Sequence, residues 1–221
     1  MNGLKVLVLE SSDNSISQII EILKKYEFCV DICSNNSDFL ECIYNNLYDL
    51  YLININEKSL PRFQLIQLLN EYHDMTMKMV IASIPNIIKP SFLSGCDECI
   101  IKNIDEEEEI LLRIKALIRR QFKIYSDSIH IKKDIEYEIF QKKILINKNE
   151  VHLGEKPLLI LDYLLKFRGI FVSSENLENG VYPANSNNKN GVIRFHIHKL
   201  RQILGNDVIV SNRVNGYKIN I

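Results

Sequence analysis

The chain has 221 residues, of which 46% are hydrophobic and 25% are charged, and its formal net charge is −1. This length allows two small domains with packed cores, and no apolar run approaches the ~20 residues that span a membrane, so we expect a cytoplasmic protein. The charge is uneven, with 13 basic and 18 acidic side chains in residues 1–125 against 14 and 10 in residues 126–221, which indicates either a basic half suited to nucleic acid or a chance surface bias.

The first half of the chain alternates between short apolar runs and helical patterns. Runs of strand length lie at residues 4–10, 29–33, 48–55, 77–83 and 98–102. Helical patterns follow each of them, at residues 11–28, 37–47, 63–72, 90–93 and 105–121. Acidic residues crowd the start of the last helix, and Arg119 and Arg120 lie at its end, as the helix dipole favours. Five strand–helix units predict a five-stranded, doubly wound parallel sheet.

From about residue 128 the pattern changes to short strands with little between them. Four such strands are expected, at residues 128–133, 136–140, 142–147 and 150–154. Helices are expected at residues 154–167, 173–181 and 192–204. The chain then ends in two strands joined by a tight turn, within residues 208–221.

The helix at residues 192–204 has two different faces. Its apolar residues are spaced four, three and four apart and share one side: Ile193, Ile197, Leu200 and Leu204. The opposite side is mostly basic or hydrogen-bonding: Arg194, Phe195, His198, Lys199 and Gln202, with Arg201 at the boundary. A buried back and a basic front fit the major groove of DNA, where Phe195 could contact a thymine methyl group. An ordinary solvated basic face is the simpler alternative.

The hairpin after this helix carries Arg213 near its tip, and Gly216 permits its tight turn. An arginine beside a groove-reading helix can enter the minor groove. The alternative is a mobile surface side chain.

These last segments resemble a known family. Residues 194–204, RFHIHKLRQIL, and residues 212–219, NRVNGYKI, are similar to the winged-helix signature of OmpR/PhoB-family transcription factors. The first half resembles the receiver domain of that family. The resemblance implies a CheY-like receiver in residues 1–122, a linker at 123–127 and a winged helix-turn-helix domain in 128–221. It also implies a sequence-specific transcriptional regulator and not an enzyme.

A working receiver of this family has two acids after its first strand to hold Mg²⁺, a phosphoryl-accepting aspartate, a hydroxyl residue and a lysine. The matching residues here are Glu10, Ser11, Asn54, Ser83 and Lys102. An amide cannot replace the carboxylate nucleophile of an acyl phosphate, and a lone acid is a poor set of ligands for Mg²⁺. We therefore expect a degenerate site that acts without aspartyl phosphorylation and without a cofactor. Either Glu10 neutralises Lys102 there, or the remaining residues are only structural.

The resemblance also implies partners. Double-stranded DNA would be bound at promoter half-sites by a homodimer, formed through the receiver face at residues 87–120. RNA polymerase would contact the polar loop at residues 182–190. Four residues are candidates for ion pairs between subunits: Asp97, Glu98, Arg113 and Arg119. Lys218 of the hairpin joins the residues expected at DNA.

Two other kinds of signalling switch remain open. Asp49 or Glu57 could accept a phosphoryl group, although Asp49 lies about 15 Å along the strand from Asn54. The five cysteines all lie in the first half, and an odd number in a cytosolic chain argues against disulfides. Cys96 and Cys99 have CxxC spacing, but a zinc site would need a second pair. They are either buried side chains or a redox-sensing pair.

Overall fold

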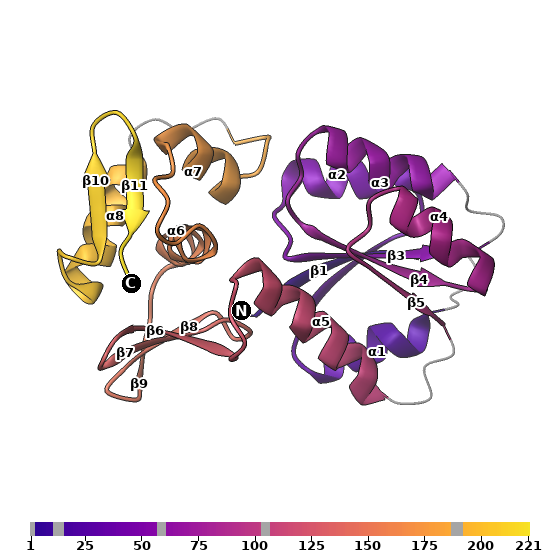
Figure 1. Cartoon of the computed structure of the whole chain (residues 1–221), viewed down its shortest axis with the longest axis horizontal. Helices are drawn as coiled ribbons and strands as arrows, with labels where there is room; N and C mark the ends of the chain where they lie inside the picture. The colour runs from indigo at the N-terminus through magenta and orange to yellow at the C-terminus, as the bar shows by residue number, and fades with distance from the viewer. Residues whose placement is uncertain (1–2, 11–15, 57–60, 103–106, 187–191) are drawn as a thin grey trace. The chain divides into compact units, whose positions relative to one another are not determined.

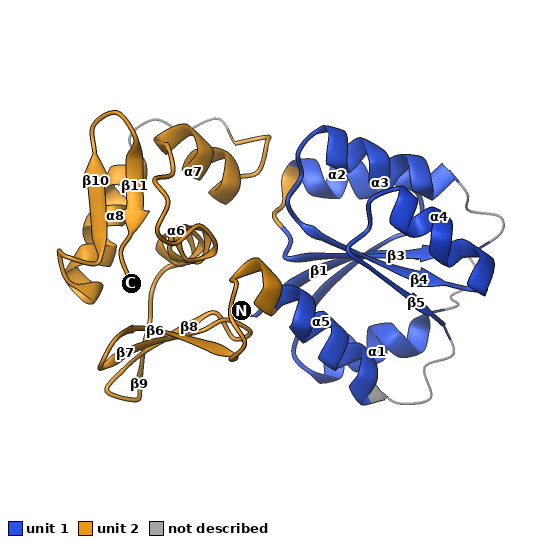
Figure 2. Cartoon of the chain, viewed as in Figure 1, with its two compact units in different colours: residues 1, 3–44, 48–118 blue, residues 2, 45–47, 119–221 orange. Residues whose placement is uncertain are grey.

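The computed structural model describes residues 3–10, 16–56, 61–102, 107–186 and 192–221. The chain divides into two compact units, which Figure 2 colours separately. The first contains Gly3–Tyr44 and Tyr48–Ile118, and the second contains Asn45–Leu47 and Arg119–Ile221. The second unit thus begins just before the expected linker. Among the described helices, none combines the length and the apolar character needed to cross a membrane.

Five parallel strands form the sheet of the first unit, in the spatial order β2-β1-β3-β4-β5. The strands are β1 (Lys5–Leu9), β2 (Cys29–Cys33), β3 (Leu50–Ile55), β4 (Met77–Ala82) and β5 (Glu98–Ile101). The helices are α1 (Ser17–Lys25), α2 (Asn36–Asn45), α3 (Pro61–Glu71), α4 (Ile88–Leu93) and α5 (Glu107–Gln121), with a 3₁₀ turn (Pro85–Ile87) before α4. Helices α1 and α5 cover one face of the sheet and α2, α3 and α4 cover the other (Figure 1). The predicted doubly wound fold is confirmed, and in such folds the functional site lies at the carboxyl ends of the strands.

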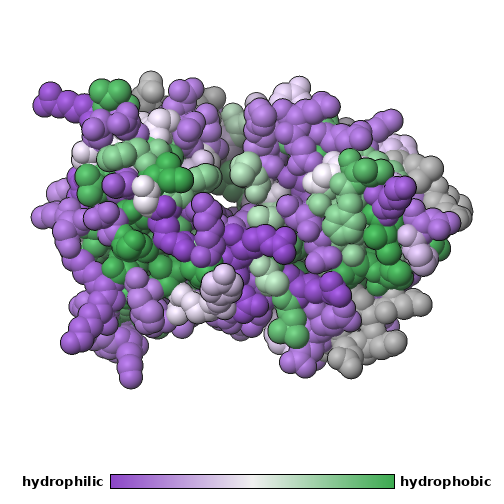
Figure 3. All heavy atoms as spheres, viewed as in Figure 1, coloured by the Kyte–Doolittle hydropathy of each residue, from purple (hydrophilic) through white to green (hydrophobic). Residues whose placement is uncertain are grey.

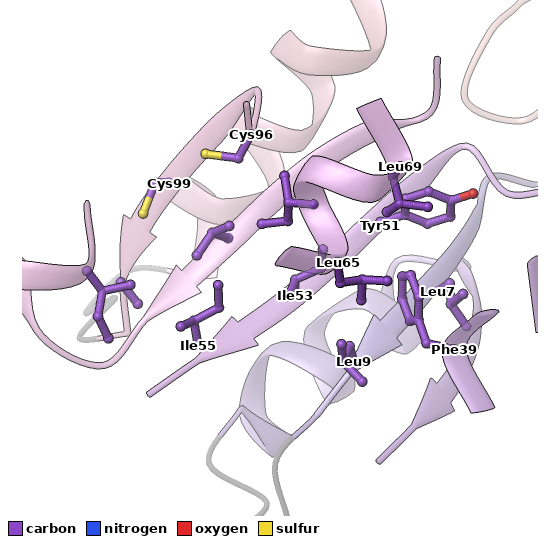
Figure 4. Close-up of a cluster of buried hydrophobic side chains, with 14 of the residues drawn as sticks. Leu7, Leu9, Phe39, Tyr51, Ile53, Ile55, Leu65, Leu69, Cys96 and Cys99 are labelled. Atoms are coloured by element: carbon purple, nitrogen blue, oxygen red, sulfur yellow. The ribbon is translucent and has the colours of Figure 1, made fainter. Parts of the chain in front are cut away.

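The side chains between this sheet and helices α2 and α3 form a buried hydrophobic cluster (Figure 4). Leu7, Leu9 and Ile53 point to the same side because alternate residues of a strand share a face. Phe39 of α2 and Leu65 of α3 pack against them. Burial of each such side chain stabilises the fold by about 1.5–3 kcal/mol. The cluster therefore fixes the strand ends, where the candidate site lies.

The second unit combines a four-stranded antiparallel sheet, three helices and a two-stranded hairpin. Its strands are β6 (Ser128–Lys132), β7 (Ile135–Glu138), β8 (Lys143–Ile146), β9 (Asn149–Val151), β10 (Ile209–Asn212) and β11 (Gly216–Ile219). Its helices are α6 (Glu155–Lys166), α7 (Ser174–Val181) and α8 (Val192–Leu204). Asn147 and Lys148 both have positive φ, at 50° and 66°, as a two-residue hairpin turn requires. The predicted winged-helix architecture is confirmed.

The hairpin of β10 and β11, hereafter the wing, is hydrogen-bonded to the segment between α6 and α7 at Val172. The backbone N–H of Tyr217 donates to the carbonyl of Val172 at 2.8 Å, and the N–H of Val172 donates to the carbonyl of Tyr217 at 2.7 Å. Gly216 has a φ of +91°, and a Cβ there would lie 2.0 Å from the Val172 carbonyl oxygen. Only glycine fits this approach without displacing backbone.

Candidate nucleic-acid interface and strand-end site

Helix α8 presents the two faces that its sequence predicts. Ile193, Ile197, Leu200 and Leu204 are all buried. The predicted front residues are exposed: Arg194, Phe195, His198 and Lys199. The Phe195 side chain is 55% exposed, and the Lys199 ammonium lies 4.7 Å from its ring centroid. This front therefore combines cations with a solvent-facing aromatic ring, a suitable chemistry for phosphates and base edges.

Arg201, which the sequence places at the boundary of the basic face of α8, forms hydrogen bonds to β10. Its Nε and Nη2 atoms donate to the backbone carbonyl of Ile209, at 3.0 and 2.7 Å, and Nη2 also donates to the Ser211 hydroxyl at 3.0 Å. The guanidinium thus joins α8 to β10 and does not point outward as a free cation. The predicted DNA contact of Arg201 stays a prediction, and in the free protein its donors are directed to β10.

The tip of the wing is pre-organised and exposed. The Asn212 side-chain oxygen accepts hydrogen bonds from the backbone N–H groups of Val214 at 2.9 Å and Asn215 at 3.0 Å. Arg213 is exposed between them, as predicted, and 89% of Val214 is exposed. Lys218 differs, because its ammonium lies 5.0 Å from the ring centroid of Phe171 in its own unit. Arg213 is therefore the exposed positive charge at the tip of the wing.

The sequence analysis did not single out Lys156, Tyr182 or His196, which lie in or next to α6, α7 and α8. The buried Tyr182 hydroxyl and the buried His196 Nδ1 atom have no hydrogen-bond partner among the described residues. The Lys156 ammonium lies 5.1 Å from the Tyr182 ring centroid. Burial, Lys199 and Lys156 lower the pKa of His196 from its ordinary value. Lys156 therefore lies near the Tyr182 ring and close enough to His196 to influence the charge of that ring.

In the first unit, Glu10 and Asn54 meet at the carboxyl ends of β1 and β3. The Asn54 Nδ2 atom donates to Glu10 Oε1 at 2.6 Å, and the backbone N–H of Ile16 donates to Glu10 Oε2 at 2.9 Å. Both side chains are buried, at 4% and 1% exposure. Both oxygens of this carboxylate are therefore already hydrogen-bonded within the chain.

Arg62 of α3 is a further member of this site that the sequence analysis missed. Its side chain is 7% exposed. Nη2 donates to the backbone carbonyls of Glu10 at 2.7 Å and Ser34 at 3.4 Å, and Nη1 donates to those of Leu9 at 3.3 Å and Asn54. The guanidinium thus lies on carbonyl groups at the ends of β1 and β3 and just after β2.

The other predicted members of the site are more peripheral. Ser83 follows β4 and its N–H donates to the Ile55 carbonyl at 3.1 Å. Lys102 follows β5 and is exposed, whereas the Glu10 carboxylate accepts hydrogen bonds from Asn54 and Ile16. Ser11 and Glu57 lie outside the described residues. Asp49 is buried at the amino end of β3, where it accepts from the Lys5 N–H at 2.8 Å, so it is remote from this edge.

Comparison with known proteins fits both units. Residues 148–219 match a family described as "Transcriptional regulatory protein, C terminal". A Staphylococcus epidermidis protein named as an epidermin response regulator is 32% identical over 184 residues, which cover 76% of this chain and 86% of that protein. The chain belongs to the response regulators. It is a transcriptional regulator with a C-terminal DNA-binding domain, of the OmpR/PhoB type that its sequence resembles.

Two further likenesses cover almost all of this response regulator. The cell cycle transcriptional regulator CtrA of Caulobacter vibrioides is 27% identical over 208 residues, covering 91% of this chain and 87% of that protein. The solved structure of DrrB, an OmpR/PhoB homologue from Thermotoga maritima, aligns with 99% of this chain and 100% of that chain, with a TM-score of 0.46 and 17% identity.

The four candidate dimer residues of the response regulator have partners within their own chain. Arg113 contacts Glu109 at 2.7 Å and Glu98 at 3.6 Å, and Arg119 contacts Asp127 at 3.1 Å. Asp97 accepts from the backbone N–H of Lys78 at 2.7 Å. Any pair between subunits would have to compete with these contacts.

Burial raises the pKa of three cysteines of the response regulator: Cys33, Cys96 and Cys99. Cys96 and Cys99 are buried in the core, and burial raises the pKa of Cys96 to about 12. The Cys33 and Cys42 sulfur atoms lie 3.3 Å apart, and burial raises the pKa of Cys33 to about 12 as well. Reaction with oxidants proceeds through the thiolate, which is scarce for such groups at neutral pH. No cluster of metal-ligating residues occurs in the described ranges.

Proposed function

We propose that this response regulator binds duplex DNA through α8 and the wing and does so without aspartyl phosphorylation. The observation that carries the proposal is the Asn54 amide, which stands at the acceptor position and donates to Glu10 at 2.6 Å. An amide offers no carboxylate nucleophile. The protein acts as a binding regulator, and we assign it no catalytic residue.

In the proposed complex α8 lies in the major groove. Arg194, His198 and Lys199 contact base edges or phosphates, and Phe195 contacts a thymine methyl group. Exposure of all four side chains supports this assignment. Arg213 at the pre-organised wing tip enters the minor groove. Arg201 contributes indirectly, by holding β10 against α8.

The group of Lys156, Tyr182 and His196 would hold one DNA phosphate. A buried polar atom without a partner costs about 1–3 kcal/mol, and a phosphate oxygen would supply the missing acceptor for the tyrosine hydroxyl and a histidine N–H. Lys156 supplies the positive charge. Burial, Lys199 and Lys156 lower the pKa of His196 in the free protein, and a bound phosphate would raise that pKa and favour the protonated ring.

The proposed regulator is a dimer joined through the face at residues 87–120. Hydrophobic patches interrupt the hydrophilic surface in the view of Figure 3. On the proposed face, Phe92, Leu93 and Leu112 are 49%, 75% and 53% exposed. Exposed ion pairs contribute only ~0–1 kcal/mol each, so burial of these apolar side chains would supply most of the association energy.

A footprint of the untreated protein tests the proposal. Duplex sites are first selected from a random library, and protection is then measured at fixed, near-physiological salt without a phosphodonor. We expect two protected half-sites about 10–10.5 base pairs apart. Arg213→Ala should weaken binding by about 1–3 kcal/mol. Lys133→Ala, at an exposed turn of the same unit, is the matched control and should bind normally.

Two outcomes would contradict the proposed function. Protection that appears only after incubation with a small phosphodonor, with a phosphoryl group detected by intact mass, would show that another residue accepts the phosphoryl group. A response to oxidant that disappears in Cys33→Ser or Cys96→Ser would instead indicate a thiol switch.

A further inference from the structure

The residues at the carboxyl end of the sheet do not fit the Mg²⁺ ion that the receiver fold implies. Mg²⁺ requires several hard, anionic oxygens in an octahedral shell. The described residues offer a single carboxylate, Glu10, whose two oxygens already accept hydrogen bonds from Asn54 and Ile16. Asn54 directs an N–H₂ donor into the site, where an acceptor aspartate would direct an oxygen.

The same site already contains a cation. The Arg62 guanidinium donates hydrogen bonds to four backbone carbonyls: those of Leu9, Glu10, Ser34 and Asn54. Burial of a charged group is costly unless that group is fully hydrogen-bonded. The guanidinium satisfies this condition with oxygens from three separate strand ends, so it links these ends as a coordinated ion would.

We propose that the Arg62 guanidinium is the resident cation of this receiver and takes the place of the divalent ion. This inference rests on the proposed function, because it explains how the strand-end site is stable in a receiver that is never phosphorylated. It predicts that the loss of metal binding is not caused by Asn54 alone. Restoring an aspartate there would leave Arg62 fixed beside it.

Charge balance supports the assignment. In the family pattern three carboxylates are balanced by Mg²⁺ and one lysine. Here the positive charge of Arg62 balances the negative charge of Glu10, and Lys102 is exposed. In Asn54→Asp the new carboxylate would be attracted to Arg62, and a divalent ion would be repelled by the guanidinium. Removal of Arg62 from that variant would leave two buried carboxylates that need a cation.

The test is a titration of the full-length chain with Mn²⁺, followed through the magnetic resonance signal of the free ion. Four proteins are compared: the natural chain, the single variant Asn54→Asp, and two double variants. The double variants combine Asn54→Asp with Arg62→Met (the Arg62→Met pair) or with Lys24→Met (the Lys24→Met pair). Lys24 is exposed on α1, so its variant controls for the loss of a positive charge elsewhere. We expect the Arg62→Met pair to bind at least about tenfold more tightly than Asn54→Asp and the Lys24→Met pair.

Two results would overturn the proposal. One is saturable binding by Asn54→Asp alone that is as tight as in the Arg62→Met pair. The other is a folded Arg62→Met pair, verified by circular dichroism, that gains no binding. If that double variant fails to fold, the comparison of Asn54→Asp with the natural chain decides. No gain in Mn²⁺ binding by Asn54→Asp supports the role of Arg62, and a clear gain refutes it. None of these titrations involves DNA, so failure of phosphorylation-independent DNA binding would be seen separately.

Discussion

Replacement of Arg201 by methionine should weaken the wing without removing a direct DNA contact. Methionine keeps most of the apolar stem of the side chain but has no donor. The carbonyl of Ile209 would lose two charged donors, at 3.0 and 2.7 Å, and Ile209 is fully buried. The bond to Ser211 is exposed and adds little.

The expected loss of stability can be estimated from these contacts. A hydrogen bond from a charged donor contributes about 1.5–3 kcal/mol, and a buried carbonyl left without a partner costs about 1–3 kcal/mol. Arg201 is itself partly exposed, so water can replace part of what is lost. We expect a cost of about 2 kcal/mol for the C-terminal unit, which corresponds to a fall of ~8–16 °C in its unfolding temperature.

Thermal unfolding and DNA affinity together separate the two roles of Arg201. For a positioning residue, the unfolding temperature falls, amide exchange in β10 accelerates and affinity decreases, but the salt dependence of binding is unchanged. For a phosphate contact, the slope of log K against log salt falls by about 0.9. The exposed Arg213→Met is the matched control and should leave the unfolding temperature unchanged. A normal unfolding temperature with a reduced slope would refute the positioning role.

Three further results are expected. His196→Gln should abolish a pH dependence in which the natural protein binds DNA more tightly as pH falls through the raised pKa of His196 in the complex; an identical dependence in both proteins would contradict the phosphate site. Burial alone would raise the pKa of Asp162, but Lys166 at 2.8 Å helps to hold it below its ordinary value, so its stabilising effect is present at neutral pH and is lost as pH falls through the lowered value. Asp162→Ala should therefore cost about 3–5 kcal/mol at pH 7 and show a shallower acid dependence of unfolding by denaturant, whereas a neutral variant would refute a coupled pair. Gly216→Ala should displace the wing from Val172 and weaken DNA binding, and a crystal structure with an unmoved wing would contradict this.

The sequence predicted elements better than it predicted contacts between elements. Helix α8 has the bounds expected from its apolar spacing, since periodicity reports which side of a helix is buried. The same spacing placed Arg201 only at a boundary. Whether its guanidinium reaches solvent or the neighbouring strand depends on the path of β10, which periodicity does not describe.

The residues missed in the sequence share this cause. Arg62 lies 52 positions from the carbonyl of Glu10 that it binds, and Lys156 is distant in the chain from Tyr182 and His196. From the sequence alone, Arg62 in the first turn of α3 is expected to be a solvent-exposed cation. Its burial follows from the way that a parallel sheet brings several strand ends together, which is a property of the fold.

The buried arginine also bears on how this protein can evolve. A single base change turns an asparagine codon into an aspartate codon, so the acceptor by itself is within easy reach of mutation. With Arg62 bound to the carbonyls of Glu10 and Asn54, that change would create an internal salt bridge and no functional switch. Recovery of signalling would need a second substitution before the first gave any advantage. Under the proposed role of Arg62, a phosphoryl switch at this site would therefore require both substitutions together.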